Sequence, residues 1–409
     1  MRELNKTLTR KSYRLIVISL FILIFFTNLF AEDIQCEWTG VERIVAVGDL
    51  HGDYHNFIKI LKDPEIKIIN DDLHWIAGKT HLVQIGDVMD RGPDAWRIFE
   101  LLRELEKEAE EAGGKVHMLL GNHEEMNICD IAFDRRRYVT VGQLLSFLPD
   151  EYVEKEEKKI RRKLGIQPPS ETDSDSTLDP NIEAFWKEKI RQSMNVRYLT
   201  RRHVRWHYIR EFNEKYAPWI LQHNAVIKIN DIVFVHGGIS ETYSTWSLKE
   251  LNAQLRQELD MFRVASLLGK ESDPNFEIVF NQNGPLWFRD YSYGFPEFEP
   301  TLDRILKNLG ATSIVTAHTP QQVESETEMS RYNEKVWIID TNISSAYLIG
   351  KLSALIIESS EKPLFKPWLK PRKDNNSSID VDNESEDMRL VAFLIINTIF
   401  LPYKFRITT

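Results

Sequence analysis

The chain has 409 residues, of which 42% are hydrophobic and 28% are charged, and its formal net charge is −10. This composition is typical of a globular protein with one large core or two smaller ones. Non-specific nucleic-acid binding depends on Lys and Arg side chains that neutralise phosphates, so the negative balance argues against it. We therefore expect no nucleic-acid partner, while a local basic pocket for a single phosphate group remains open. The sequence alone gives no prediction of whether the protein is a monomer or an oligomer.

Residues 1–31 have the pattern of an export signal. Basic residues, among them Lys6, Arg10, Lys11 and Arg14, precede an apolar run over 15–26, as in a secretory signal. Ala31 marks the expected cleavage position, and an uncleaved N-terminal membrane anchor is the alternative. We expect the protein to be exported (periplasmic or secreted) or membrane-anchored. In either case Cys36 and Cys129 form a disulfide or remain small buried thiols.

Strands and helices alternate along the next part of the chain. Apolar residues recur at helical spacing between two predicted strands, and Gly113-Gly114 ends that helix. This helix carries Trp96, Phe99, Leu102, Leu105 and Ala109. The alternation predicts an α/β fold, a β-sandwich flanked by helices, over residues 41–357.

Three segments differ in composition from this pattern. Residues 128–225 combine dense charge with a proline-containing interval, which predicts a largely helical insertion. The insertion is either a substrate-selecting lid or a solvated helical hairpin. Residues 374–388 are polar and acidic, which indicates a disordered linker. Residues 389–409 form a hydrophobic tail that is either a terminal strand or an interfacial membrane anchor.

Six short segments place acids, amides, histidines and two arginines where no core needs them, and five directly follow apolar strand-like runs. They are 48–52 (GDLHG), 86–92 (GDVMDRG), 121–124 (GNHE), 236–238 (HGG), 287–290 (WFRD) and 317–319 (AHT). The segment around Arg289 follows Pro285-Leu286 and is less clearly a strand end. Each motif is weak by itself, but six in this order predict one shared site.

The residue types suit two divalent metal ions. A carboxylate with two oxygens can bridge two ions, and Asp87 is the candidate. Asp49 and His51, two apart on one loop, reach the first ion. The expected ligands of the second ion are Asn122, His236 and His318. Mixed oxygen and nitrogen ligands favour Mn, with Fe or Zn as alternatives, over Ca or Mg.

Other residues of these segments suit phosphate chemistry. The forked guanidinium donors of Arg91 and Arg289 match phosphate oxygens, and Asn122 also contacts the phosphoryl group. His123 is placed to protonate the leaving oxygen. Asp90 holds the other ring nitrogen of this histidine. We expect Glu124 to support this loop rather than perform chemistry.

The ordered motifs resemble those of the metal-dependent phosphoprotein phosphatase (calcineurin-like phosphoesterase) superfamily over roughly residues 41–357. The bacterial, Shewanella-like branch is the most similar, because Leu120 stands where eukaryotic relatives carry an arginine. The resemblance implies the roles given above for Asp49, His51, Asp87 and the Asn122-His123 pair. It also implies the roles given for Asp90, Arg91, His236, Arg289 and His318. Residues 342–344 (NIS) replace the Gly-Met-Ser of that branch, which leaves the contribution of this loop to the pocket open.

These observations predict a dinuclear-metal phosphomonoesterase, a protein phosphatase acting on phosphoserine, phosphothreonine or phosphotyrosine, or on small phosphoesters. The expected reaction is direct attack on phosphorus by a water that the metals activate. Two alternatives remain: a diadenosine-polyphosphate or other phosphodiester hydrolase with the same metal site, and a membrane-tethered binding module without turnover.

Overall fold

The structure is a computed structural model that describes residues 34–132, 138–163, 188, 190–192, 202–269, 278–359 and 363–372. The expected export signal (1–31), linker (374–388) and hydrophobic tail (389–409) lie outside the described residues, as does part of the insertion. None of the helices in the described ranges is long and apolar enough to cross a bilayer.

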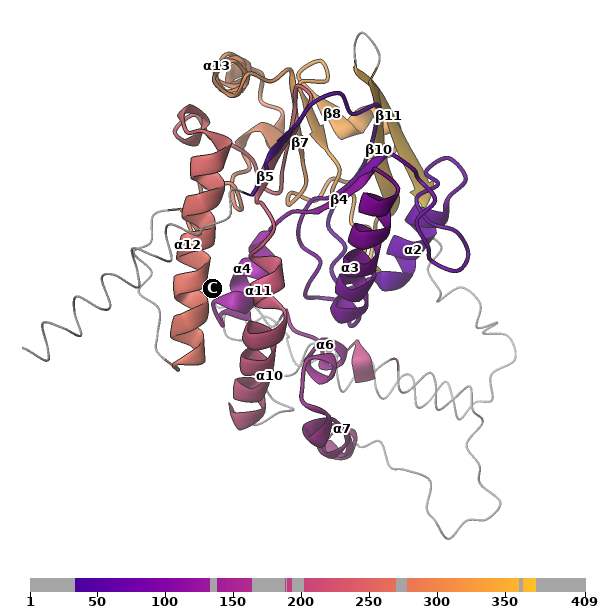
Figure 1. Ribbon diagram of the computed structural model, residues 1–409, viewed down its shortest axis with the longest axis vertical. Coiled ribbons are helices and arrows are strands. Elements are labelled where there is room, and N and C mark those ends of the chain that lie inside the picture. The colour runs from indigo at the N-terminus through magenta and orange to yellow at the C-terminus, as the bar shows by residue number, and fades with distance from the viewer. Residues whose placement is uncertain are drawn as a thin grey trace, which may run out of the picture.

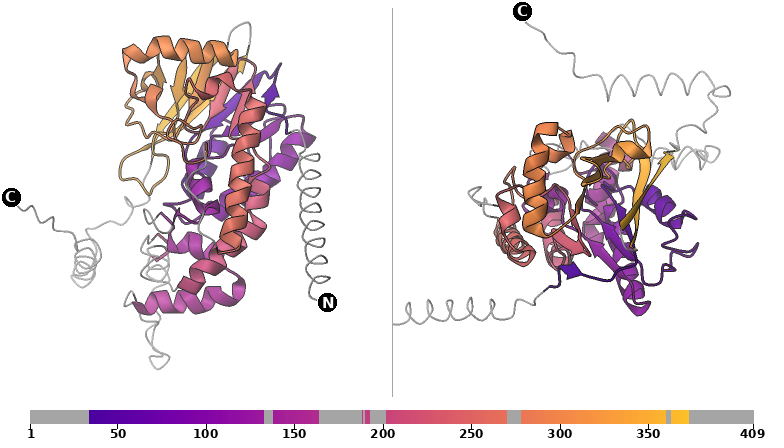
Figure 2. Two further views of the ribbon diagram at one scale, coloured as in Figure 1. Left: turned by 90° about the vertical axis from the view of Figure 1, so that its left-hand side faces the viewer. Right: turned by 90° about the horizontal axis from the view of Figure 1, so that it is seen from above.

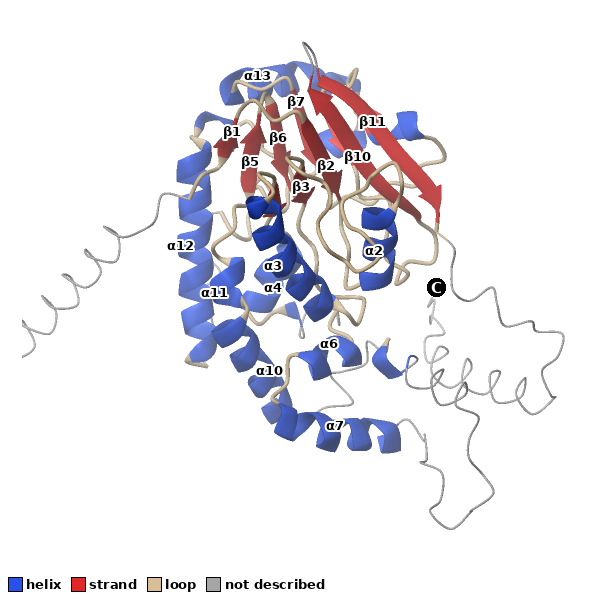
Figure 3. Cartoon of the chain, turned by 45° about the vertical axis from the view of Figure 1, so that its right-hand side comes forward, coloured by secondary structure: helices blue, strands red, loops and turns tan. Residues whose placement is uncertain are grey.

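Two mixed β-sheets form the centre of the protein (Figures 1 and 3). The first sheet has the spatial order β1 (Glu37–Trp38), β5 (Val226–Ile229), β6 (Ile232–Val235), β7 (Ser313–Thr316), β9 (Val336–Ile338) and β8 (Ser330–Arg331). The second has the order β11 (Pro363–Pro371), β10 (Lys351–Ser359), β2 (Arg43–Val47), β3 (His81–Gln84) and β4 (Lys115–Met118). This α/β sandwich with helices confirms the predicted fold class.

The inner strands are largely apolar and buried, as in β6 (IVFV), because both faces of each sheet are covered. In β2, Ile44 and Ala46 belong to the cluster shared by the two sheets. Val45 and Val47, on the opposite face, pack in the larger cluster that includes helix residues such as Phe99. Covering helices are α2 (Tyr54–Lys62) and α3 (Ala95–Glu111), and α12 (Leu248–Leu267) runs beside β5 (Figure 2). Of the predicted helical repeat, Phe99, Leu102, Leu105 and Ala109 lie in the buried stripe of α3, whereas Trp96 is 37% exposed.

The described part of the insertion is helical. Helix α4 (Asn122–Ile128) precedes it, and the insertion itself contains α6 (Val141–Ser146), α7 (Asp150–Lys163), α10 (Arg202–Lys215) and α11 (Ala217–Ile220). These helices lie together at one end of the molecule, beyond the sheets (Figure 3).

The two cysteines are both reduced and buried, and no disulfide joins them. Burial raises the pKa of the Cys129 thiol well above its usual value. Of the two expectations for this pair, the structure has the buried thiols.

Candidate active site

The carboxyl ends of six strands meet at one edge of the sandwich. β2, β3 and β4 are parallel neighbours in one sheet, and β6, β7 and β9 are parallel neighbours in the other. Parallel strands end at the same edge, so the loops that follow them converge. Five of these loops are the motifs of the sequence, and the sixth follows β9 and carries Asp340.

The backbone of these loops is unusually bent. Five of the predicted site residues have positive φ, which non-glycine residues rarely adopt: His51 (43°), Asp87 (55°), Asp90 (69°), Arg91 (66°) and His318 (63°). Close approach also explains one glycine, since a Cβ on Gly121 would lie 2.3 Å from the Asp87 Oδ1 atom. The loops are therefore held in strained conformations that aim side chains at one point.

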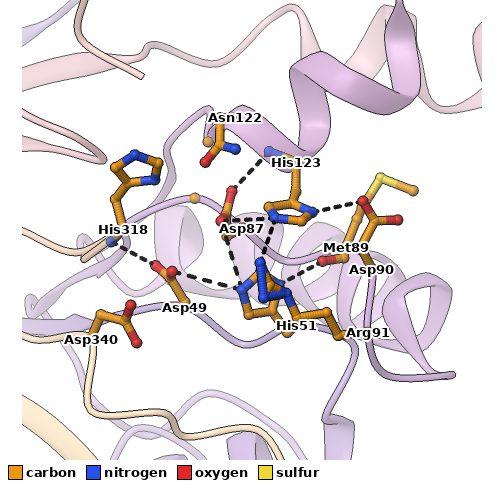
Figure 4. Close-up of polar contacts among 12 residues, drawn as sticks. Asp49, His51, Asp87, Met89, Asp90, Arg91, Asn122, His123, His318 and Asp340 are labelled. Carbon is orange, nitrogen blue, oxygen red and sulfur yellow. Dashed lines mark hydrogen bonds and ion pairs between the residues drawn. The ribbon is translucent and has the colours of Figure 1, made fainter. Parts of the chain in front are cut away.

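A first group of potential metal ligands comprises His51, Asp87 and His123, whose donor atoms all lie within 4.8 Å of one another (Figure 4). The His51 Nε2 atom lies 3.8 Å from Asp87 Oδ2 and 3.8 Å from Asp49 Oδ2. Its other ring nitrogen, Nδ1, contacts the Met89 carbonyl oxygen at 2.9 Å, so Nε2 is the nitrogen that faces the carboxylates. The structure thus brings Asp49, His51 and Asp87 together.

A second group comprises Asp87, His236 and His318. The His236 Nε2 atom lies 3.3 Å from Asp87 Oδ1, 3.0 Å from Asn122 Oδ1 and 3.1 Å from His318 Nδ1. Its Nδ1 contacts the Ile85 carbonyl oxygen at 2.8 Å, which orients the ring. Asp87 belongs to both groups, through its two different oxygens.

The site contains several buried carboxylates, and their negative charge favours the binding of cations. Asp49, Asp87 and Asp340 are all buried. Burial, with the charges of Asp340 and Asp87, raises the pKa of Asp49 well above its usual value. Burial also acts to raise the pKa of Asp87, but His236, His123 and His51 together hold it well below the usual value. Three buried carboxylates in contact require compensating positive charge.

The donor set fits a pair of divalent metal ions. The Nε2 atom of His318 and the Oδ2 atom of Asp340 are buried and have no hydrogen-bond partner among the described residues. Unsatisfied buried polar atoms are costly, and coordination of a metal would satisfy a histidine nitrogen of this kind. Carboxylate, amide and imidazole donors match Mn, Fe or Zn.

His123 and Asp90 form a buried pair beside the two groups. His123 Nδ1 lies 2.7 Å from Asp90 Oδ2. On the other side of the ring, Arg91 Nη2 lies 3.2 Å from His123 Nε2. A guanidinium can only donate, so Nε2 accepts there, and Nδ1 donates to the carboxylate.

The insertion holds the Asp90 carboxylate from behind. The Gln143 side chain of α6 donates to Asp90 Oδ1 at 2.8 Å and accepts from the Asp90 backbone N–H at 2.8 Å. Asn127 donates to both oxygens of the same carboxylate, at 3.1 and 3.0 Å. The Tyr208 hydroxyl of α10 donates to Asn127 Oδ1 at 2.8 Å and accepts from Gln143 Nε2 at 2.9 Å.

The two arginines approach the site from different loops. Arg91 Nη1 donates to the Tyr347 hydroxyl at 2.7 Å, and its guanidinium lies over the rings of Tyr138 and Tyr347. Arg289 Nη1 donates to the His318 carbonyl oxygen at 2.9 Å and to Thr319 Oγ1 at 3.0 Å. The structure therefore places Arg91 beside His123 and Arg289 beside His318.

Glu124 organises the second motif. Its carboxylate accepts backbone N–H bonds from Asp87 and Val88 at 2.9 Å, from Met89 at 3.2 Å and from Gly121 at 2.9 Å. Burial and the charge of Asp87 raise its pKa to about 7. The side chain thus supports the loops that carry the other residues, as expected for it.

Sequence reasoning missed four residues that shape the site. Asp340 follows the apolar run of β9, the same signal that marked the other strand ends. Gln143 and Tyr208 lie in the insertion and Asn127 lies just before it. None of the three had a comparable signal, because their arrangement around Asp90 depends on tertiary packing.

Comparison with known proteins agrees with this geometry. The family model described as calcineurin-like phosphoesterase matches residues 42–322. Shewanella-like protein phosphatase 1 of Plasmodium berghei (strain Anka) is 26% identical over 312 residues, which cover 75% of this chain and 68% of that protein. Shewanella-like protein phosphatase 2 of Arabidopsis thaliana is 31% identical over 264 residues, which cover 64% of this chain and 61% of that protein, less than two thirds of its length.

A solved structure is similar over most of the chain. The cold-active protein-tyrosine phosphatase of a psychrophilic Shewanella species has a TM-score of 0.53 and 25% sequence identity, and the match covers 83% of this chain and 84% of that one. The family resemblance predicted from the motifs is therefore confirmed. With a family model that spans most of its folded part and the motif residues gathered at one edge of its two sheets, this chain belongs to the calcineurin-like phosphoesterase family.

Proposed function

We propose that the protein is a metal-dependent protein phosphatase that removes the phosphoryl group from phosphoserine, phosphothreonine or phosphotyrosine. The observation that carries the proposal is that Asp87 is shared by two groups of potential metal ligands, with His123 and Arg91 directly beside them. The names of the similar proteins, two Shewanella-like protein phosphatases and a protein-tyrosine phosphatase, support the substrate class.

Two divalent ions at Asp49, His51, Asp87, Asn122, His236 and His318 would supply a nucleophilic water of lowered pKa and positive charge for the phosphoryl group. We propose Mn as the native metal, with Fe or Zn as alternatives, because the donor set mixes oxygen and nitrogen atoms.

The protein's own residues bind and orient the phosphoester. Arg91 and Arg289 donate to the phosphoryl oxygens, and the Asn122 amide donates to one of them. When the phosphate draws Arg91 away from His123, the Nε2 atom of that imidazole is free to take up a proton from solvent and to pass it to the leaving oxygen. Asp90 fixes the ring through Nδ1 and stabilises its protonated form.

The first 31 residues support a further proposal, that the protein is exported and either released by cleavage after Ala31 or retained as a membrane-anchored enzyme. The apolar tail over 389–409 supports a second membrane contact. Fractionation of expressing cells, with N-terminal sequencing of the mature chain, tests both.

An activity screen tests the proposed function. The full chain, loaded in turn with Mn, Fe and Zn, is assayed with p-nitrophenyl phosphate and with phosphoserine, phosphothreonine and phosphotyrosine peptides. Turnover that chelation abolishes and metal restores is expected. Preference for bis-p-nitrophenyl phosphate or a diadenosine polyphosphate over every monoester would instead identify a phosphodiester hydrolase.

A further inference from the structure

The loop between β9 and β10 exposes apolar side chains. Leu348 is 93% exposed and Ile349 is 65% exposed, the two largest exposed fractions among the large hydrophobic side chains of the described ranges. Single exposed apolar residues are ordinary, but two consecutive ones at the mouth of a site need a reason.

These residues are adjacent to the phosphate-binding side of the site. The preceding residue, Tyr347, accepts a hydrogen bond from Arg91 Nη1 at 2.7 Å, and its ring lies 5.7 Å from the His51 ring. Successive Cα atoms are about 3.8 Å apart, so Leu348 begins within one residue of a group that contacts a phosphate-binding arginine. A substrate that is held by Arg91 and continues beyond the phosphoryl group therefore has this loop close to its next residue.

The loop is held rigidly from below. Arg372, which follows β11, donates from Nη1 to the carbonyl oxygens of Asn342 at 3.0 Å and Ser344 at 2.6 Å, and from Nη2 to that of Tyr347 at 2.6 Å. The Ser345 backbone N–H donates to Asp53 Oδ2 at 2.7 Å. Because these bonds fix the backbone, the exposed side chains are presented to solvent and do not fold back onto the core. Binding of a partner therefore costs little conformational entropy in this loop.

From this arrangement we infer that Leu348 and Ile349 form an apolar lip that contacts a residue next to the phosphorylated residue of a protein substrate. The occupant is an extended phosphopeptide segment with an apolar side chain at a flanking position. A small phosphoester fills the arginine side of the site but leaves the lip in water, whereas a peptide covers both. This inference rests on the proposed phosphatase function and narrows its substrate class.

The test compares two phosphopeptides that differ only in having Leu or Gly on both sides of the phosphorylated residue. kcat and KM are measured with the Mn-loaded full chain for both peptides and for p-nitrophenyl phosphate. The variants are Leu348→Ser, Ile349→Ser and the double substitution. The matched control is Leu364→Ser, which removes another exposed leucine (52%) on β11. Leu364 pairs with Glu358, seven residues along β10 from Lys351, hence about 23 Å from the loop.

We expect wild type to prefer the Leu-flanked peptide. The double variant should lower kcat/KM for that peptide about tenfold, mainly through KM, because a buried side-chain contact of this size is lost. Its activity on the Gly-flanked peptide and on p-nitrophenyl phosphate should match wild type, and Leu364→Ser should match wild type throughout.

Equal losses on all three substrates would mean that the loop only supports the site, and would overturn the lip. Equal turnover of the two peptides by wild type would also overturn the lip, but it would not contradict the proposed phosphatase function. Wild type that hydrolyses p-nitrophenyl phosphate but neither peptide would overturn the protein substrate and the lip together. Absence of any monoester turnover would overturn the proposed function itself.

Discussion

The imidazole of His123 and the carboxylate of Asp90 face one another across 2.7 Å, and both side chains are buried. A histidine held in this way has a fixed ring orientation and a partner for its positive form, which are the two requirements of a general acid. Its second nitrogen points toward Asp87, at 3.8 Å from Oδ2.

Replacing His123 with alanine should lower kcat on a phosphoserine peptide by roughly 10²- to 10⁴-fold, the usual contribution of a general acid. The loss on p-nitrophenyl phosphate should be much smaller, since its leaving group needs little protonation. The measurement is steady-state kinetics on both substrates, together with metal content by elemental analysis. An undiminished kcat on the alkyl phosphate would contradict the acid role.

Replacing Asp87 with asparagine should reduce bound metal in both groups, because one side chain serves both. Elemental analysis of the purified variant after Mn loading gives the metal content per chain. Asp71→Asn is the control, since the Asp71 side chain is fully exposed. Two ions retained by the Asp87 variant would exclude the shared ligand.

Replacing Tyr208 with phenylalanine tests whether the insertion acts on the reaction. The change removes the hydroxyl that joins Asn127 and Gln143 behind Asp90, so we expect unfolding to become easier by about 1 kcal/mol. We also expect kcat to fall several-fold with KM unchanged. Tyr332→Phe removes a hydroxyl that donates to a carbonyl elsewhere, that of Phe295, and should leave kcat intact. Identical kinetics for the two variants would show that the insertion is only a scaffold here.

Two buried histidines, His81 and His117, should make the free energy of unfolding depend on pH. Burial, with the charge of Lys115, lowers the pKa of His81 to about 4. In the unfolded chain this pKa is about 6.5, so the unfolded state binds more protons between these two values. Above pH 6.5, His81 therefore does not reduce the free energy of unfolding. As the pH falls toward 4, this free energy decreases by up to about 3 kcal/mol. Urea unfolding at pH 7.5, 6 and 5 should show a shallower decrease for His81→Gln than for wild type; parallel curves would contradict the assignment.

The strand ends were predictable because their signal is local. A glycine and a polar residue directly after an apolar run mark a chain that leaves a buried sheet, and this holds for Gly48-Asp49, Gly86-Asp87 and Gly121-Asn122. Asp340 follows the apolar run of β9 without a glycine, so it shows only the polar part of this signal, which the same reasoning could still have used. Gln143 was not predictable in this way, because its contact with Asp90 spans 53 residues and nothing in the short helical segment 141–146 (VGQLLS) indicates it.

The C-terminal strands show a different limit. A run of large apolar residues before the last hairpin begins at Tyr347, but β10 begins at Lys351, because Arg372 and Asp53 bind the backbone of the preceding loop. β11 contains Pro363, Pro367 and Pro371, which argue against a central strand. They are compatible with the edge position that it takes beside β10.

The proposed ligand residues run from Asp49 to His318 and come from loops of both sheets, and this has a consequence for synthesis of the protein. While the ribosome is still translating, a nascent chain that has not yet released His318 from the exit tunnel lacks the last donor of the second group. Metal loading is thus a late event that follows translation of about three quarters of the polypeptide. A nascent chain that is stalled or truncated before that point could not bind the full set of metal ions.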